Sequence, residues 1–174
     1  MRAPSSVYTK ASAGSPAPVA PEFFARREAE IARRFVFLLR FFTPRTVFLE
    51  LGTRDCELAL RAAAYVERVW SVDAPHGIAR GVRPPTNLRM LRTGGLAAIP
   101  PESVDVAFSE RPMDPGRVHR VLVPGGIWFV AGPLVPARLF HAAGFSRVVY
   151  YAGGVRVPAS LAKLSRATTV AAYK

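Results

Sequence analysis

The chain has 174 residues, half of them hydrophobic, and a formal net charge of +12. This length and hydrophobic content predict one globular domain with a substantial core. The only cysteine, Cys56, excludes an intrachain disulfide, and no apolar run reaches the roughly 18 residues of a membrane span. No hydrophobic leader segment follows Arg2. We therefore expect a cytoplasmic protein without a membrane partner.

The positive charge has two interpretations. Arginine supplies far more of it than lysine, which occurs only at positions 10, 163 and 174. A strongly basic chain attracts polyanions, so a nucleic acid is one candidate partner. The other interpretation is coding composition, because the arginines are dispersed along the chain and form no single run.

The N-terminal part divides into a tail and a helix. Residues 1–20 are rich in Ser, Ala, Pro and Gly, which predicts a disordered tail before a single domain over residues 21–174. Residues 21–43 predict a helix, with apolar residues at spacings of three and four and Thr43-Pro44 at its end. It would either cover the sheet or lie on nucleic acid or membrane as a basic amphipathic helix. We favour the first, since such a helix is ordinary before the first strand of an α/β unit.

Residues 46–73 form the stretch around which the chain is organised. They predict a strand, a tight turn at Gly52, a helix and a second strand that ends in Asp73. A glycine turn that feeds a helix leaves the first helical N–H groups open to a ligand. An acid at the tip of the neighbouring strand, about 20 residues on, can accept both hydroxyls of a ribose. This stretch predicts a nucleoside-bearing ligand at the carboxyl ends of parallel strands.

The rest of the chain continues the alternation of strands and helices. We expect further strands at residues 87–92, 104–108, 127–130, 145–151 and 168–173. Residues 124–126 predict a turn. We expect His119 to lie on a short helix, residues 133–143 to form another short helix, and residues 159–164 to form one or two helical turns.

Four motifs in order carry a resemblance to a known family. They are Glu50-Leu51-Gly52-Thr53-Arg54-Asp55-Cys56, Ser71-Val72-Asp73, residues 103–109 (SVDVAFS) and residues 120–126 (RVLVPGG). Together they resemble the class I S-adenosylmethionine-dependent methyltransferases, in particular the small, methyltransferase type 11-like members. The resemblance runs from about Val47 onward. It implies an α/β fold with a Rossmann-like, doubly wound, mostly parallel seven-stranded sheet and an antiparallel C-terminal strand.

The resemblance also implies a cofactor, S-adenosyl-L-methionine, and the residues around it. Asp73 would hold the ribose, Thr93 the adenine edge, and Gly52 with the backbone after it the methionine part. Glu110 would face the acceptor as a catalytic base, although a solvated or arginine-paired glutamate is the alternative. The full set expected at the cofactor is Glu50, Gly52, Thr53, Arg54, Asp73, Ala74, Thr93, Gly94 and Ser109.

Three departures from the family pattern keep a second function open. Arg54 stands where a second glycine is usual, Thr93 where an acid is usual, and the region after Glu110 is short. These features favour a catalytically inactive, methyltransferase-like binding protein for a nucleic acid or protein partner. An NAD-dependent oxidoreductase is excluded, because Arg54 and Glu57 occupy the later glycine positions of Gly-x-Gly-x-x-Gly. The sequence shows no metal cluster, and it predicts neither the methyl acceptor nor the oligomeric state.

Overall fold

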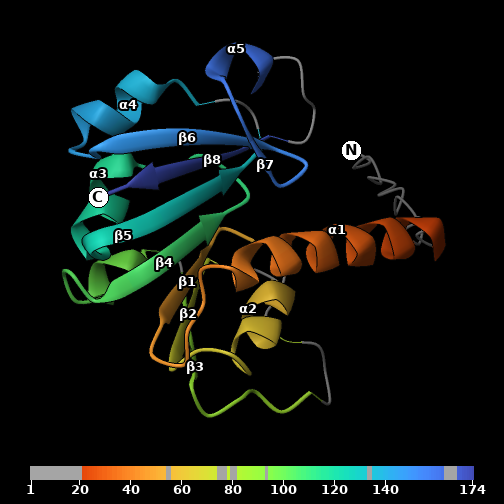
Figure 1. Cartoon of the computed structure of the whole chain (residues 1–174). Coiled ribbons are helices and arrows are strands. Elements are labelled where there is room, and N and C mark those ends of the chain that lie inside the picture. The colour runs from red at the N-terminus through yellow and green to blue at the C-terminus, as the bar shows by residue number, and fades with distance from the viewer. Residues whose placement is uncertain are drawn as a thin grey trace, which may run out of the picture.

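The computed structural model describes residues 21–53, 56–73, 78, 82–92, 94–132, 135–162 and 168–174. These residues form a sheet with helices on both faces (Figure 1). The helices are α1 (Pro21–Leu39), α2 (Glu57–Ala62), η1 (Gly95–Ala98), α3 (Pro115–Val121), α4 (Ala137–Ala142) and α5 (Ala159–Ala162). The strands are β1 (Val47–Leu51), β2 (Arg68–Val72), β3 (Leu88–Leu91), β4 (Val104–Ser109), β5 (Leu122–Ala131), β6 (Arg147–Ala152), β7 (Val155–Val157) and β8 (Thr168–Tyr173). The predicted tail over residues 1–20 lies outside the described residues.

The sheet has eight strands in the order β3-β2-β1-β4-β5-β8-β6-β7. The pairs from β3 to β5 are parallel, whereas β8 is antiparallel to both β5 and β6, and β7 is antiparallel to β6. The chain first builds β1, β2 and β3 toward one edge and then returns to place β4 on the other side of β1. In such sheets ligands bind outside the carboxyl ends of the strands where the order reverses. That position here is the carboxyl edge of β1 and β4.

The Rossmann-like, mostly parallel fold expected from the sequence is confirmed, but the count of seven strands was wrong by one. The additional strand is β7, which has three residues and pairs with β6 after a turn at Gly153-Gly154. So short a run carries little periodicity, which is why it was missed. The expected turn at residues 124–126 was also wrong, because β5 continues through it. Gly125 has φ +80°, and the register of β5 against β4 shifts between Val104 and Val106, as at a β-bulge.

Both faces of the sheet are buried, and neighbouring residues of β1 show this directly. Phe48 and Leu49 are both fully buried but belong to different clusters, because successive side chains of a strand point to opposite faces. The cluster around Phe48 includes residues of α1 and α2, and the cluster around Leu49 includes residues of η1, α3 and α4. The central strands therefore carry buried apolar side chains on both faces.

Helix α1 packs on the sheet through its C-terminal half. Leu38 is fully buried, and the rings of Phe37 and Phe41 lie 5.3 Å and 4.7 Å from that of Phe129 on β5. The N-terminal half of the helix extends past the sheet (Figure 1). None of the described helices combines the length and apolar character that crossing a membrane requires.

Candidate functional site

The candidate site lies where β1, β2 and β4 end, and the turn after β1 forms its floor. Gly52 has φ +60°, a left-handed conformation that glycine adopts without steric cost, and its N–H donates a 2.9 Å hydrogen bond to the Val72 carbonyl. A Cβ placed on Gly52 would lie 3.8 Å from Sδ of Met113, its nearest neighbour among the described atoms. The backbone at this turn is therefore accessible to a ligand.

Asp73 follows β2 at the same edge and carries an unusual carboxylate. Its φ is +60°, and its N–H donates a 3.2 Å hydrogen bond to the Leu91 carbonyl. Its Oδ1 is buried, yet it has no hydrogen-bond partner among the described residues. A buried oxygen without a donor is costly, and such groups are rare in folded proteins. A hydroxyl of a bound ligand would remove that cost, so Asp73 fits the ribose position.

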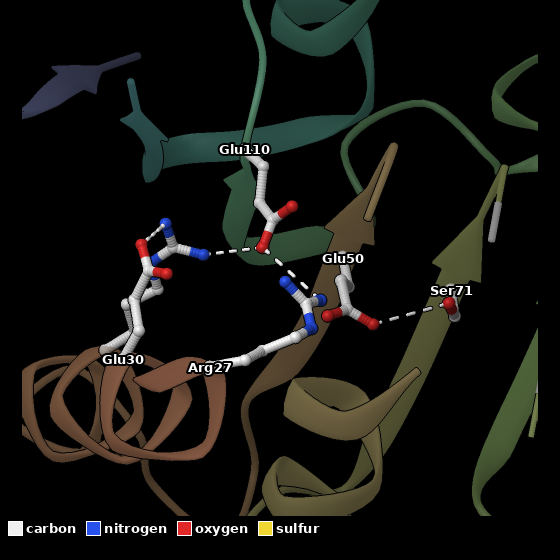
Figure 2. A network of polar contacts seen from close by, with 6 residues as sticks. Arg27, Glu30, Glu50, Ser71 and Glu110 are labelled. Atoms are coloured by element: carbon white, nitrogen blue, oxygen red, sulfur yellow. Dashed lines mark hydrogen bonds and ion pairs between the residues drawn. The ribbon is translucent and has the colours of Figure 1, made fainter. Parts of the chain in front are cut away.

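Glu50 lies beneath this edge, on the face of the sheet that α1 covers. The residue is only 1% exposed, and Ser71 Oγ donates a 3.4 Å hydrogen bond to its Oε2. Cys56 Sγ lies 3.4 Å from the same Ser71 hydroxyl. Figure 2 shows the Glu50 carboxylate between Ser71 on β2 and the Arg27 guanidinium from α1. The first strand thus carries a buried acid within a polar cluster that joins β1, β2 and the segment before α2.

Glu110 follows β4 and is paired with arginines of α1. Arg34 Nη1 donates a 2.5 Å hydrogen bond to Oε1 of Glu110, and Arg27 Nη2 lies 3.9 Å from the same oxygen. Arg34 also pairs with Glu30 and places its guanidinium carbon 5.7 Å from the centre of the Phe108 ring. The side chain of Glu110 is 18% exposed. This network fixes the middle of α1 to the end of β4 (Figure 2).

The other expected site residues do not form one group in the structure. Thr53 is buried, and Gly94 is the N-cap of η1 with φ +83°. Ser109 is fully buried, and its hydroxyl accepts a 3.1 Å hydrogen bond from Nε1 of Trp128 in the core. Arg54, Ala74 and Thr93 lie outside the described residues. The edge therefore brings together the Gly52 turn, Asp73, Glu50 and Glu110, while the Ser109 hydroxyl is directed to the core.

Sequence reasoning missed Arg27, Arg34 and Met113. The two arginines are seven positions apart, which puts them two turns apart on one side of α1, and this spacing was the available signal. Nothing in the sequence indicated which acid they would meet. In the part of the chain that the structure describes, no three His, Cys, Asp or Glu side chains gather as a metal site requires.

Neither a family model nor a curated protein sequence matches this chain. Solved structures do. The tRNA (m1A58) methyltransferase TrmI of Aquifex aeolicus superposes with a TM-score of 0.59 at 14% identity, over 83% of this chain and 68% of that chain. A methyltransferase from Archaeoglobus fulgidus that depends on S-adenosylmethionine superposes with a TM-score of 0.57 at 10% identity, over 89% of this chain and 100% of that chain. A chain from the complex of the Haloferax volcanii methyltransferase activator Trm112 with a methyltransferase superposes with a TM-score of 0.58 at 16% identity, over 89% of this chain and 98% of that chain.

These likenesses establish the architecture. The chain has the fold of class I S-adenosylmethionine-dependent methyltransferases. The resemblance drawn from the four sequence motifs is thus confirmed at the level of the fold, whereas activity and acceptor depend on the site.

Proposed function

We propose that the chain is an S-adenosylmethionine-dependent methyltransferase whose Asp73 holds the ribose of the cofactor. The observation that carries this proposal is the buried Oδ1 of Asp73, which has no hydrogen-bond donor among the described residues. It lies at the end of β2, beside the strand whose turn carries Gly52. In a doubly wound sheet this is the position from which an acid binds ribose hydroxyls.

The remaining cofactor contacts follow from the same edge. The open backbone at Gly52 and Thr53 suits the methionine part, because a ligand can approach a turn that lacks a Cβ. Arg54, Ala74, Thr93 and Gly94 remain predicted contacts in this proposal. The bound cofactor would supply an electrophilic methyl group.

Glu110 is the residue proposed to act on the acceptor. Both arginine contacts described for it use Oε1. We assign Oε2 the role of accepting a proton from an acceptor that carries one, with Arg34 and Arg27 keeping the carboxylate in place. Methyl transfer otherwise depends mainly on alignment of the acceptor with the methyl group.

A methyltransferase-like binding protein without catalysis is the second candidate. The ion pair between Glu110 and Arg34 favours it, because a carboxylate that anchors a helix is explained without any catalytic role. The two candidates differ in whether the cofactor binds.

Thermal melting with S-adenosylhomocysteine distinguishes the methyltransferase from the non-catalytic binding protein. Ligand at about 100 times its Kd adds roughly 2.7 kcal/mol, which raises the Tm of a domain of this size by about 5 to 10 °C. Asp73→Asn tolerates the left-handed backbone but removes a charged acceptor. Loss of one charge-assisted hydrogen bond weakens binding about tenfold, so the Tm increase should fall by about 3 to 5 °C.

The matched control is Asp114→Asn. Asp114 is exposed and caps α3 by accepting a 2.9 Å hydrogen bond from the Gly116 N–H, a role that asparagine also fills. Its response to ligand should equal that of the wild type. An unchanged response in Asp73→Asn would remove Asp73 from the cofactor site, and no response of the wild type at millimolar ligand would favour the non-catalytic candidate.

A further inference from the structure

The charge of this chain is distributed unevenly. Residues 115–174 contain no Asp or Glu but eight cations, which are Arg117, Arg120, Arg138, Arg147, Arg156, Lys163, Arg166 and Lys174. The first 114 residues therefore contribute only +4 of the net charge of +12. The strands β5, β6, β7 and β8 all come from the segment without acids. One half of the sheet is thus built from a part of the chain that contains basic residues but no acidic ones.

Two arginines and two tyrosines of this half lie on one face of the sheet. Register places Arg147 on β6 opposite Tyr173 on β8, and Tyr151 on β6 opposite Arg156 on β7. Paired residues share a face, and both tyrosines pack against the cluster on the α1 side. We call these four residues, together with Arg40 in the turn directly after α1, the basic face.

Contacts hold two of the three cations of the basic face over aromatic rings. The Arg147 guanidinium carbon lies 3.9 Å from the centre of the Tyr173 ring, and that of Arg40 lies 4.7 Å from the centre of the Phe37 ring. Arg40 Nη2 also donates a 3.2 Å hydrogen bond to the Gly154 carbonyl in the turn before β7. These contacts position the two guanidinium groups and leave further N–H donors for a ligand.

The tyrosines of the basic face are joined to each other. Burial and a hydrogen bond to Tyr173 raise the pKa of the Tyr151 hydroxyl, while the charges of Arg40 and Arg156 act to lower it. Register places Arg156 opposite Tyr151, and the Phe37 ring under the Arg40 guanidinium lies 5.1 Å from the Tyr151 ring. One continuous surface joins α1, β6, β7 and β8.

No acid of the described chain neutralises this surface. Among the described residues no ion pair involves Arg40, Arg147 or Arg156, although all three are exposed. The acids of α1 are paired elsewhere, with Arg26, Arg61 and Arg34. Residues 1–20 contain Arg2 and Lys10 but no acid, so their charge would repel them from the basic face. A partner with negative charge is the occupant that fits.

We propose that the basic face binds a single-stranded nucleic acid. Guanidinium groups match the geometry of phosphate and form two parallel hydrogen bonds with it, and here arginine supplies every cation. Bases stack on aromatic rings and on guanidinium planes, and the Arg147 guanidinium that covers the Tyr173 ring offers such a plane beside the partly exposed Tyr151 and Tyr173. An acidic protein surface or an anionic membrane would use the charge but not the tyrosine rings. This inference goes beyond methyl transfer and does not depend on it.

Fluorescence anisotropy with the full chain and a labelled RNA of about 15 nucleotides tests the proposal, with a DNA strand of the same sequence alongside. The variant is R40Q/R147Q/R156Q, and the matched control is R33Q/R68Q/R89Q, which removes three exposed arginines from α1, β2 and β3. Both reduce the net charge equally. We expect the first to bind at least about tenfold more weakly near physiological salt and the control less than about threefold. The slope of log affinity against log salt should fall by about 2 for three lost phosphate contacts on a single strand.

Substitution of one ring separates stacking from charge. Tyr173→Leu should weaken binding about fivefold or more, while Tyr173→Phe should bind like the wild type because the ring remains. Equal losses in the two triple variants, or wild-type affinity in R40Q/R147Q/R156Q, would overturn the proposal. Binding to duplexes alone, or to phosphatidylserine vesicles but not to RNA or DNA, would overturn it as well. Thermal melts with S-adenosylhomocysteine on the same variants report folding and cofactor binding separately, so failure of either idea is recognised on its own.

Discussion

Arg34 of α1 donates a 2.5 Å hydrogen bond to Glu110, 76 positions later, at the end of β4. The two side chains are 22% and 18% exposed, so the pair is largely shielded from water. It ties α1, just beyond its midpoint, to the carboxyl edge at which we place the cofactor. Glu110 follows β4, a central strand of the parallel half, and Glu28 of α1 forms a further ion pair with Arg61 of α2.

Loss of the Glu110 charge should destabilise the protein measurably. Glu110→Gln removes the ion pair and leaves Arg34 with Glu30, at a cost of about 1 to 2 kcal/mol in the free energy of unfolding. Urea unfolding measures it. Glu28→Gln is the control, because its pair with Arg61 has an acid that is 59% exposed and should contribute at most about 0.5 kcal/mol. Equal effects of the two substitutions would show that burial does not strengthen the Arg34 pair.

Two glycines with nearly the same backbone conformation separate strain from ligand binding. Gly52 has φ +60° and Gly153 has φ +58°, so alanine at either position should cost about 1 kcal/mol of stability. Only Gly52→Ala should also reduce the Tm increase produced by S-adenosylhomocysteine, because Gly153 lies in the turn between β6 and β7. Chemical unfolding and ligand melts of both variants make the comparison. A reduced ligand response in Gly153→Ala would argue against the proposed site.

The Ser109 hydroxyl should matter for the core. Ser109→Ala leaves the buried Nε1 of Trp128 without its 3.1 Å acceptor, which should cost about 1 to 3 kcal/mol. Ser103→Ala is the control, since that exposed hydroxyl bonds only to the nearby Pro100 carbonyl and its loss should stay within about 0.5 kcal/mol. Denaturant midpoints decide the matter. A stable Ser109→Ala that binds ligand poorly would return Ser109 to the cofactor site.

Stability should fall at high pH through Tyr151. Its pKa is raised in the folded protein, chiefly by burial and then by the hydrogen bond to Tyr173. The folded state therefore favours the protonated phenol, and this contribution is complete below the ordinary tyrosine pKa of about 10 and lost as the pH rises through the folded value. Tyr151→Phe should flatten the decline in unfolding free energy between about pH 9 and 11. The control is Tyr65→Phe, at an exposed tyrosine, whose unfolding free energy should decline over this pH range as that of the wild type does.

The sequence was most informative where the structure is local. The unit from β1 to β2 could be read from apolar runs, a glycine turn and a terminal acid that lie within 28 residues of one another. The position of Asp73 at a strand end followed from the same pattern, but the lack of a donor for its Oδ1 did not, because burial depends on distant segments. The pairing of Arg34 with Glu110 was out of reach for the same reason. Short elements such as β7 leave too few residues for a period to be recognised.

The uneven charge was visible in the sequence, yet its meaning was not. Arginines that look dispersed along the chain converge once β6, β7 and the end of α1 are placed side by side. Register and helix packing decide which of them share a surface, and neither can be obtained from spacing alone.

The place of β8 in the sheet constrains how the protein emerges from the ribosome. This strand follows β6 and β7 in the chain but lies between β5 and β6. Until β8 has been made, β6 and β7 have no strand through which to join β5, and a lone two-stranded hairpin is at best marginally stable in water. The nascent chain therefore exposes two strand edges that attract other strands, one on β5 and one on β6. Insertion of β8 closes both at once, so this half of the domain acquires its protection from aggregation in one step of folding.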